Sequence, residues 1–376
     1  MRELCPKSVV GIALLGLAVV LVAQPVEAKV RAGVVNDFSL VSPSPYPSAV
    51  SGQAFVWQDE VYVPGATLIK LHFAEFDLTP GDRLEISDAS GATRHSYTER
   101  GPKGNGSFWA LSVPGEVAQV RLYSHGAGGH GFVVNKIARG EQVFVQESIC
   151  ETDGRLDVAC FGQAGKNITE PVARLFYCDG FFCFNCTGFL VNGSNSNLLM
   201  TNEHCITNQA AVDTLEADFN FQNASCGGGA NDPTSTYSGN TFISDDPGLD
   251  YSLMTLSGSP EANHGEFDAS DNPISNGDLI AIPQHGGGNE KTVGYWEDSA
   301  QTARCDVHSS NVTIFGYDAG SQFLYGCDTE GGSSGSPVAG LSQRAIVGIH
   351  HLGGCDNAAT HMDDICADAG SLLNCI

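Results

Sequence analysis

The chain contains 376 residues, of which 42% are hydrophobic and only 16% are charged, so it has enough apolar material for two domains. Its formal net charge of −25 would repel nucleic acids and anionic membranes, which argues against both as partners. Glycine is abundant, with 45 residues, as is typical of a loop-rich β protein.

Residues 1–28 have the features of a secretory signal peptide. Arg2 and Lys7 provide a positive start, residues 9–23 form an apolar run, and residues 26–28 (VEA) offer a cleavage site. A membrane anchor is the alternative, but the apolar run is shorter than the roughly 20 residues that a spanning helix requires. We therefore expect a soluble protein that is secreted from the cell, with the periplasm as the alternative compartment.

The cysteines support export. The chain has 13 of them, and removing Cys5 of the leader leaves 12, all between Cys150 and Cys375. An even number of cysteines in an exported chain indicates a framework of up to six disulfide bonds.

Residues 29–147 form a region without cysteine. Several of its segments alternate apolar and polar residues with the period of a strand, and turn sequences such as TPGD and GPKG separate them. These segments are 67–76, 83–87, 106–113 and 118–124. We predict a β-sandwich here, and no binding site, because its histidines are scattered.

Residues 148–376 contain many short strand-like runs between loops rich in Gly, Asn, Asp and Ser. Examples are 188–192, 197–201, 212–221, 251–256, 278–283 and 344–350. Helical patterns are weak. The pattern predicts antiparallel β-barrels, and the fold class is therefore all-β.

The sequence GGSSGSP at residues 331–337 is the sharpest motif. It has the G-x-S-G-x-P arrangement of trypsin-like proteases, in which a seryl hydroxyl projects from a tight loop beside two backbone N–H groups. Ser334 is then the nucleophile, and the N–H groups of Gly332 and Ser334 form the oxyanion hole. The alternative is a Gly/Ser surface loop.

A candidate general base precedes this motif in the chain. In LLMTNEHC an apolar run ends in Thr-x-x-His-Cys, and His204 is the histidine. An imidazole can take the seryl proton and return it to the leaving amine. A structural or metal-binding histidine is the alternative.

Asp250 begins the run DYSLMTL and is the candidate orienting acid, with Asp245 and Asp246 as competitors in the same loop. Such an acid fixes the histidine tautomer and stabilises the imidazolium. The order His–Asp–Ser is that of chymotrypsin.

Four segments together resemble the bacterial lysyl endopeptidases of the trypsin superfamily: SICETDGRLDVAC at 148–160, CTG at 186–188, NFQNASC at 220–226, and GGSSGSP. The region 29–147, with LIKLHF and GSFWALSVPGE, resembles the propeptide of those precursors. The resemblance implies a signal peptide (1–28), a β-sandwich prodomain (29–147) and a two-β-barrel trypsin-like protease domain (148–376).

The family also implies three disulfide bonds, and we propose three further pairs among the remaining cysteines, although sequence alone does not fix connectivity. The first three are Cys150–Cys355, Cys160–Cys226 and Cys186–Cys205, and the others are Cys178–Cys183, Cys305–Cys327 and Cys366–Cys375. Two metal alternatives are disfavoured: an iron–sulfur spacing at Cys178, Cys183 and Cys186, and a zinc site from His350, His351 and His361. No metal or cofactor is expected.

The residue preference at the cleavage site has competing interpretations. Asp328 lies six residues before Ser334, where trypsin carries its specificity aspartate, whereas the position of the lysyl family's acid falls on Thr360, near Asp363 and Asp364. Thr329 and His350 instead resemble the pocket of staphylococcal-type glutamyl endopeptidases, and they would suit a carboxylate. We favour cleavage after Lys/Arg, with cleavage after Glu/Asp as the alternative.

The sequence thus predicts a secreted, monomeric serine endopeptidase that hydrolyses protein or peptide substrates through an acyl-enzyme. It is expected to be made as a zymogen that loses residues 29 to about 146. A non-catalytic protease-like binding protein, and an esterase or narrow-target protease with the same triad, are the rival interpretations.

Overall fold

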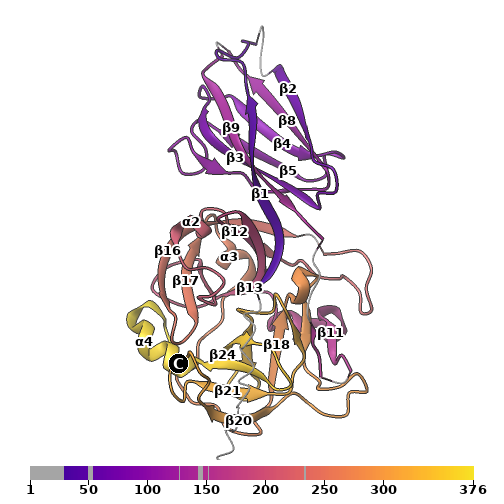
Figure 1. Ribbon diagram of the computed structural model, residues 1–376, viewed down its shortest axis with the longest axis vertical. Helices are drawn as coiled ribbons and strands as arrows, with labels where there is room; N and C mark the ends of the chain where they lie inside the picture. Colours follow the sequence, from indigo (N-terminus) through magenta and orange to yellow (C-terminus); the bar gives the residue numbers. More distant parts are fainter. Residues whose placement is uncertain (1–28, 50–53, 127, 143–146, 151, 233) are drawn as a thin grey trace, which may run out of the picture.

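The computed structural model describes residues 29–49, 54–126, 128–142, 147–150, 152–232 and 234–376. The expected signal peptide, residues 1–28, lies outside the described residues. Figure 1 shows an N-terminal β-sandwich stacked on two β-barrels, so the all-β, two-barrel prediction is confirmed. Among the helices of the described segments, none is both long and apolar enough to cross a bilayer.

The sandwich contains nine strands, β1 (Val30–Val41), β2 (Ala54–Tyr62), β3 (Leu68–Asp77), β4 (Arg83–Asp88), β5 (Arg94–Thr98), β6 (Phe108–Trp109), β7 (Val113–Pro114), β8 (Val117–Ser124) and β9 (Gly131–Gly140). One sheet has the order β1-β9-β3-β6, with β7 also paired to β3, and the other has the order β2-β8-β4-β5. Alternate residues of β8 are buried, as its sequence pattern predicts. The aromatic rings of Phe73, Phe76, Phe108 and Phe132 meet in the core between the sheets.

The prediction of one strand over residues 106–113 is wrong, because the structure divides this segment into β6 and β7. Between them the N–H of Ala110 donates to the carbonyl of Leu71, and the N–H of Leu111 donates to the Tyr97 hydroxyl at 2.7 Å. A tyrosine side chain thus replaces a strand partner at this point.

The first barrel has six strands, β12 (Val172–Asp179), β13 (Phe182–Leu190), β14 (Leu198–Thr201), β15 (Glu216–Phe219), β16 (Ser235–Asp246) and β17 (Tyr251–Leu256). Their order is β12-β15-β16-β17-β14-β13, and the pairing of β13 with β12 closes the barrel. The short helices α2 (Gln209–Val212) and α3 (Pro260–His264) lie in its connections.

The second barrel is built from an eight-stranded sheet of order β11-β19-β18-β23-β24-β25-β21-β20. The strands are β11 (Arg155–Asp157), β18 (Ile280–Gln284), β19 (Thr292–Gly294), β20 (Val307–Val312), β21 (Gln322–Tyr325), β23 (Pro337–Gly340), β24 (Ala345–Leu352) and β25 (Asn357–His361). Strands β10 (Glu147–Ser148) and β22 (Thr329–Glu330) pair in a separate two-stranded antiparallel ribbon. The helical pieces are η1 (Val158–Phe161), α1 (Gly162–Asn167), η2 (Gly286–Gly288), α4 (Met362–Ala369) and η3 (Gly370–Leu372).

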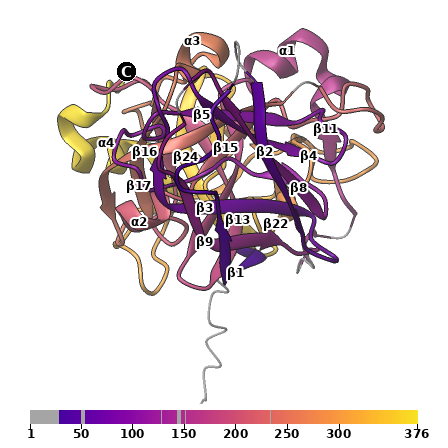
Figure 2. The same ribbon diagram turned by 90° about the horizontal axis from the view of Figure 1, so that it is seen from above.

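The sandwich and the first barrel share a continuous sheet, because β1 pairs with β9 in the sandwich and with β13 in the barrel. The view in Figure 2 shows the sandwich strands lying over the barrels. A buried ion pair reinforces the junction, with Lys70 Nζ 2.7 Å from Glu216 Oε1 and side chains that are 2% and 3% exposed. The backbone N–H and hydroxyl of Ser112 both donate to the same carboxylate at 2.6 Å.

The described residues contain six disulfide bonds, and they join the same cysteines that the sequence analysis paired. They are Cys150–Cys355, Cys160–Cys226, Cys178–Cys183, Cys186–Cys205, Cys305–Cys327 and Cys366–Cys375. The iron–sulfur alternative is therefore wrong, because its three cysteines are all oxidised in disulfides.

Candidate active site

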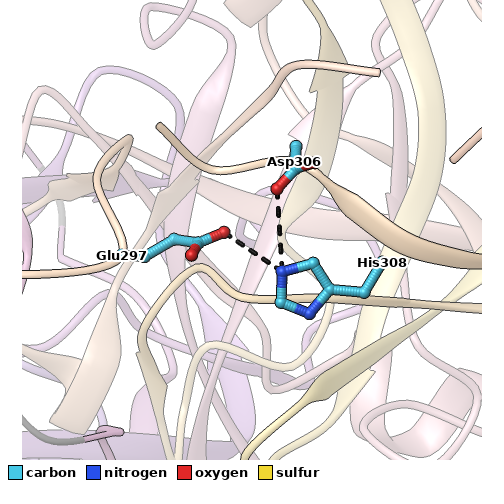
Figure 3. A group of neighbouring side chains, drawn as sticks. All are labelled: Glu297, Asp306 and His308. Atoms are coloured by element: carbon cyan, nitrogen blue, oxygen red, sulfur yellow. Dashed lines mark hydrogen bonds and ion pairs between the residues drawn. The ribbon is translucent and has the colours of Figure 1, made fainter. Parts of the chain in front are cut away.

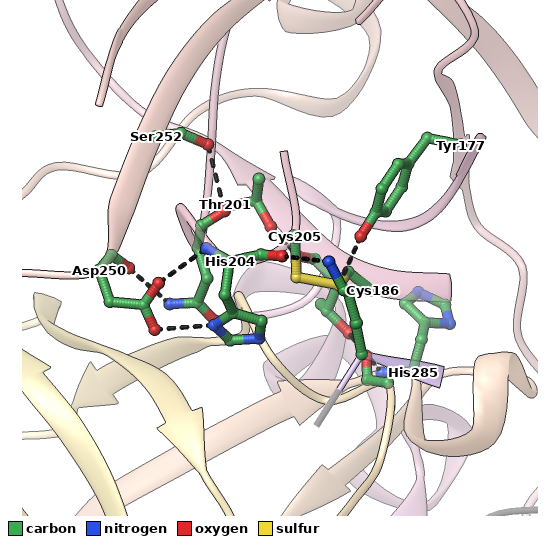
Figure 4. The surroundings of a disulfide bond; sticks show 12 residues. Tyr177, Cys186, Thr201, His204, Cys205, Asp250, Ser252 and His285 are labelled. Carbon is green, nitrogen blue, oxygen red and sulfur yellow. Dashed lines mark hydrogen bonds and ion pairs between the residues drawn. A yellow bond between two sulfur atoms is a disulfide. The ribbon is translucent and has the colours of Figure 1, made fainter. Parts of the chain in front are cut away.

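His204 and Asp250 meet because the strands that carry them are neighbours. His204 follows β14, Asp250 immediately precedes β17, and these strands pair with Thr201 opposite Ser252. The backbone N–H of His204 donates to Asp250 Oδ1 at 2.9 Å, and His204 Nδ1 lies 2.8 Å from Oδ2 (Figure 4). A proton held on Nδ1 leaves Nε2 as the basic nitrogen, which is the tautomer that a general base requires.

Asp250 is held in place from several sides. Its backbone has a φ of 50°, in the left-handed region that few non-glycine residues adopt, and the side chain of Asn202 donates to its carbonyl at 2.8 Å. His351 Nδ1 approaches Oδ2 at 3.3 Å. Burial alone would raise the pKa of Asp250, but His204 and His351 outweigh it and hold that pKa well below its usual value. The carboxylate is therefore charged throughout the physiological range.

Ser334 is positioned by the segment that follows Cys186. The N–H of Thr187 donates to the Ser334 carbonyl at 2.8 Å, and Cys186 is bonded to Cys205, the neighbour of His204 (Figure 4). The disulfide thus ties the serine loop and the histidine loop to one short stretch of chain. The Ser334 side chain is fully buried, and within the described residues its hydroxyl has no hydrogen-bond partner.

The loop on both sides of Ser334 depends on glycine. Gly335 has a φ of 86°, and a Cβ at this position would lie 2.1 Å from the Thr187 carbonyl oxygen. Gly332 has a φ of 95°, and its carbonyl accepts from the Thr187 hydroxyl at 3.0 Å. That hydroxyl in turn accepts from the backbone N–H of His285. The expected oxyanion loop is therefore fixed by bonds to two neighbouring segments.

Comparison with known proteins agrees with this arrangement. Residues 149–365 match the family described as "Lysyl endopeptidase, C-terminal domain". The chain belongs to the lysyl endopeptidase family. Like other members, it is a trypsin-like serine endopeptidase.

Two relatives and one solved structure illustrate the similarity. "Secreted RxLR effector protein 73" of Plasmopara viticola is 28% identical over 316 residues, 78% of this chain and 77% of that protein. The lysyl endopeptidase of Pseudomonas aeruginosa is 30% identical over 213 residues, 53% of this chain and 44% of that protein, so the match spans less than half of that relative's length. A solved Glu endopeptidase has a TM-score of 0.40 at 19% identity, covering 58% of this chain and 96% of its own.

In this member of the lysyl endopeptidase family, the Asp328 carboxylate accepts hydrogen bonds from backbone N–H groups. Its Oδ1 accepts from the N–H of Cys150 at 3.0 Å, and its Oδ2 accepts from the N–H of Gly154 at 2.8 Å. The residue is fully buried, and burial is the main cause that raises its pKa. Both carboxylate oxygens thus anchor the first residues of the protease domain, which argues against the expected substrate contact of Asp328.

Thr329 and His350 lie close to the serine loop. The N–H of Gly335 donates to the His350 carbonyl at 2.9 Å, and the Thr329 hydroxyl donates to Asn357 Oδ1 at 3.0 Å. His350 Nδ1 lies 2.5 Å from the Tyr325 hydroxyl. Burial, followed by the neighbouring His351, lowers the pKa of His350 to about 3. A neutral His350 that accepts the tyrosine proton at Nδ1 carries its own proton on Nε2 and can donate there.

The buried histidines predict acid sensitivity. Burial also lowers the pKa of His264 to about 4. In the unfolded chain the pKa of a histidine is about 6.5. At a pH between the folded and the unfolded pKa, the unfolded chain therefore binds more protons than the folded chain, and the free energy of unfolding falls as the pH falls. We expect His350 to contribute a loss on the order of 3 kcal/mol between pH 7 and pH 4. Urea unfolding at both pH values measures it, and an equal loss in a His350→Gln variant would contradict this assignment.

Sequence reasoning missed three residues that position the site. His351 contacts the candidate acid, Asn202 holds the backbone of that acid, and Thr187 binds both the serine and the oxyanion loop. The pair of histidines in VGIHHLGG and the threonine after Cys186 were visible in the sequence. Their roles depend on contacts between distant loops, which no local pattern reveals.

One group of side chains in the described part of the chain brings three metal-ligating residues together. It consists of Glu297, Asp306 and His308, with His308 Nε2 at 3.2 Å and 3.6 Å from the two carboxylates (Figure 3). Asp356 holds the other ring nitrogen at 2.8 Å. Partial burial would lower the pKa of His308, but the carboxylates of Asp356 and Glu297 outweigh it and raise that pKa, so charge pairing accounts for the group. The zinc alternative at His350, His351 and His361 is not formed among the described residues.

Proposed function

We propose that the protein is a secreted endopeptidase in which Ser334, His204 and Asp250 form the catalytic triad. The observation that carries this proposal is the double hydrogen bond of Asp250 to His204, formed beside the loop that holds Ser334. Ser334 Oγ attacks the peptide carbonyl while His204 Nε2 takes the seryl proton. His204 then gives this proton to the leaving amine, and water releases the acyl group by the reverse sequence.

The N–H groups of Gly332 and Ser334 would stabilise the oxyanion in both steps. No cofactor is needed for this chemistry. The signal peptide expected from the sequence of residues 1–28 and the six disulfide bonds of the described residues support secretion, because such bonds persist in oxidising compartments. The relative from Plasmopara viticola is itself named a secreted protein.

The N-terminal sandwich, residues 29–147, is proposed to be a prodomain that is cut near residue 146. The contacts between Lys70 and Glu216 would keep it bound after the cut, since they are buried. The intact mass of the active secreted protein shows whether the chain has been cut. An active species that is uncut between residues 29 and 147 would refute the cleavage.

The residue preference at the cleavage site is proposed to be Glu or Asp rather than Lys or Arg. The family name suggests lysine, but both oxygens of Asp328 are occupied by backbone donors. Thr360, at the family's acidic position, is not an acid. The Nε2–H of the neutral His350 offers a donor that suits a side chain with acceptor oxygens, whereas the Thr329 hydroxyl already donates to Asn357.

A mixed-sequence peptide library tests both proposals. The secreted protein is expected to cut after Glu or Asp, and a Ser334→Ala variant of the same preparation is expected to cut nothing. Cut sites are read by mass spectrometry. Cuts after lysine would overturn the preference alone, whereas equal cutting by the Ser334→Ala variant would overturn the triad.

A further inference from the structure

The N-terminal end of β1 lies along an edge of the first barrel. Val30 pairs with Asn185, Arg31 with Phe184, and Val34 with Phe182, all in antiparallel register. Strand β13 pairs with β12 along its opposite edge. On the edge that faces β1, the barrel strand β14 pairs with β13 only at Phe189 and Leu190. Residues 30–34 therefore cover an edge of β13 that the barrel itself leaves open.

This edge leads directly to the candidate triad. Asn185, the partner of Val30, is followed by Cys186, whose disulfide holds the His204 loop, and by Thr187, whose N–H bonds the Ser334 carbonyl. Lys29 Nζ donates to the backbone carbonyl of His204 at 3.1 Å. The beginning of β1 is thus beside the catalytic residues.

The direction of β1 resembles that of one half of a substrate. From Val30 to Val34 the chain runs away from Ser334, because its partners run from Asn185 back to Phe182. A peptide bound with its scissile carbonyl at Ser334 also leaves the serine in the amino-to-carboxyl direction over the residues that follow the scissile bond. Extended peptides commonly bind by adding a strand to such an edge.

We propose that residues 30–34 inhibit the protease by lying along this edge of β13, in the place of the part of a peptide substrate that follows the scissile bond. The proposal rests on the catalytic function proposed above. The strand is a tethered competitor, and short tethers give effective concentrations of about millimolar.

Other contacts hold the strand in this position. The Arg31 guanidinium lies 4.3 Å from the centre of the Phe182 ring, and the N–H of Val35 donates to the Phe181 carbonyl at 2.9 Å. The buried Lys70–Glu216 pair fixes the sandwich that carries the strand. His204 is 8% exposed and Ser334 is fully buried, consistent with a closed site.

Two substrates distinguish inhibition at this edge from a general effect. Both carry the same residues before the scissile bond, chosen from the library. One ends in a p-nitroanilide and has no residues after the bond, whereas the other is a quenched fluorescent peptide that continues for several residues. A double variant, Val30→Pro and Arg31→Pro, weakens the pairing, because one of two consecutive N–H groups faces β13 and proline has none.

The long peptide is expected to show a KM about tenfold lower in the double variant with kcat unchanged, as for a strand docked about 90% of the time. The anilide should show no change. Asp37→Ala, on the part of β1 that pairs with β9, is the control and should behave like the parent.

An equal change for both substrates, or an unchanged KM for the long peptide, would overturn the proposal. If the prolines unfold the sandwich, a chain that lacks residues 29–31 removes the same pairing and is judged by the same criterion. Failure of the catalytic proposal looks different: neither substrate is hydrolysed by any form, and a phosphonate inhibitor does not label Ser334.

Discussion

Replacement of Asp250 by asparagine is expected to lower kcat about 10⁴-fold while the protein stays folded. In the parent protein the Asp250 carboxylate accepts two hydrogen bonds from His204, one from the backbone N–H and one from Nδ1. Asparagine can keep the first through its carbonyl oxygen. Its NH2 group would face Nδ1 as a donor and would favour the tautomer with the proton on Nε2, which cannot take a proton from Ser334.

The measurement is kcat on the best library peptide, with active-site concentration from a phosphonate and folding from circular dichroism. Asp245→Asn is the matched control, since this residue shares the loop region but forms a backbone pair on β16 opposite Ser252. The control should keep full activity. If both variants lose activity equally, or Asp250→Asn loses none, Asp250 is not the orienting acid.

The fold class and the candidate triad could be predicted because each rests on a local pattern. Period-two alternation identified strands of the sandwich such as β3, β4 and β8, and the motifs around His204 and Ser334 combine unusual residues at fixed spacing. Asp250 was harder, because an aspartate before a strand is common and only the order of the three segments selected it. The structure adds the pairing of β14 with β17, which explains why these loops meet.

The remaining features depend on contacts between distant parts of the chain. Counting residues placed Asp328 in a substrate pocket, but its surroundings are set by Cys150 and Gly154. Likewise, the cysteine boundary suggested two separate domains, yet β1 pairs with β9 of the sandwich and with β13 of the first barrel in one continuous sheet. Nothing in the local sequence of residues 30–34 indicates a partner 150 positions further along, because many strands can complete the same pattern.

The second large effect is expected on the stability of the junction between the sandwich and the first barrel. Replacing Lys70 by methionine should lower the free energy of unfolding by about 3–5 kcal/mol, because it leaves the buried Glu216 carboxylate without its cation. Ser112 would still donate two hydrogen bonds, which cannot neutralise the charge. Urea unfolding of the full chain measures the loss.

Lys103→Met is the control for this variant. It breaks a second ion pair across the same junction, Lys103–Asp213, whose side chains are 34% and 49% exposed, so a loss under about 1 kcal/mol is expected. A second change, Glu216→Gln, should recover part of the Lys70→Met loss, because the amide removes the buried charge while its carbonyl oxygen can still accept from Ser112. Equal losses for Lys70→Met and Lys103→Met would show that the buried pair does not fasten the sandwich. With the predicted difference, the sandwich is a bound partner of the barrel, and any cut near residue 146 would leave β1 in place beside His204.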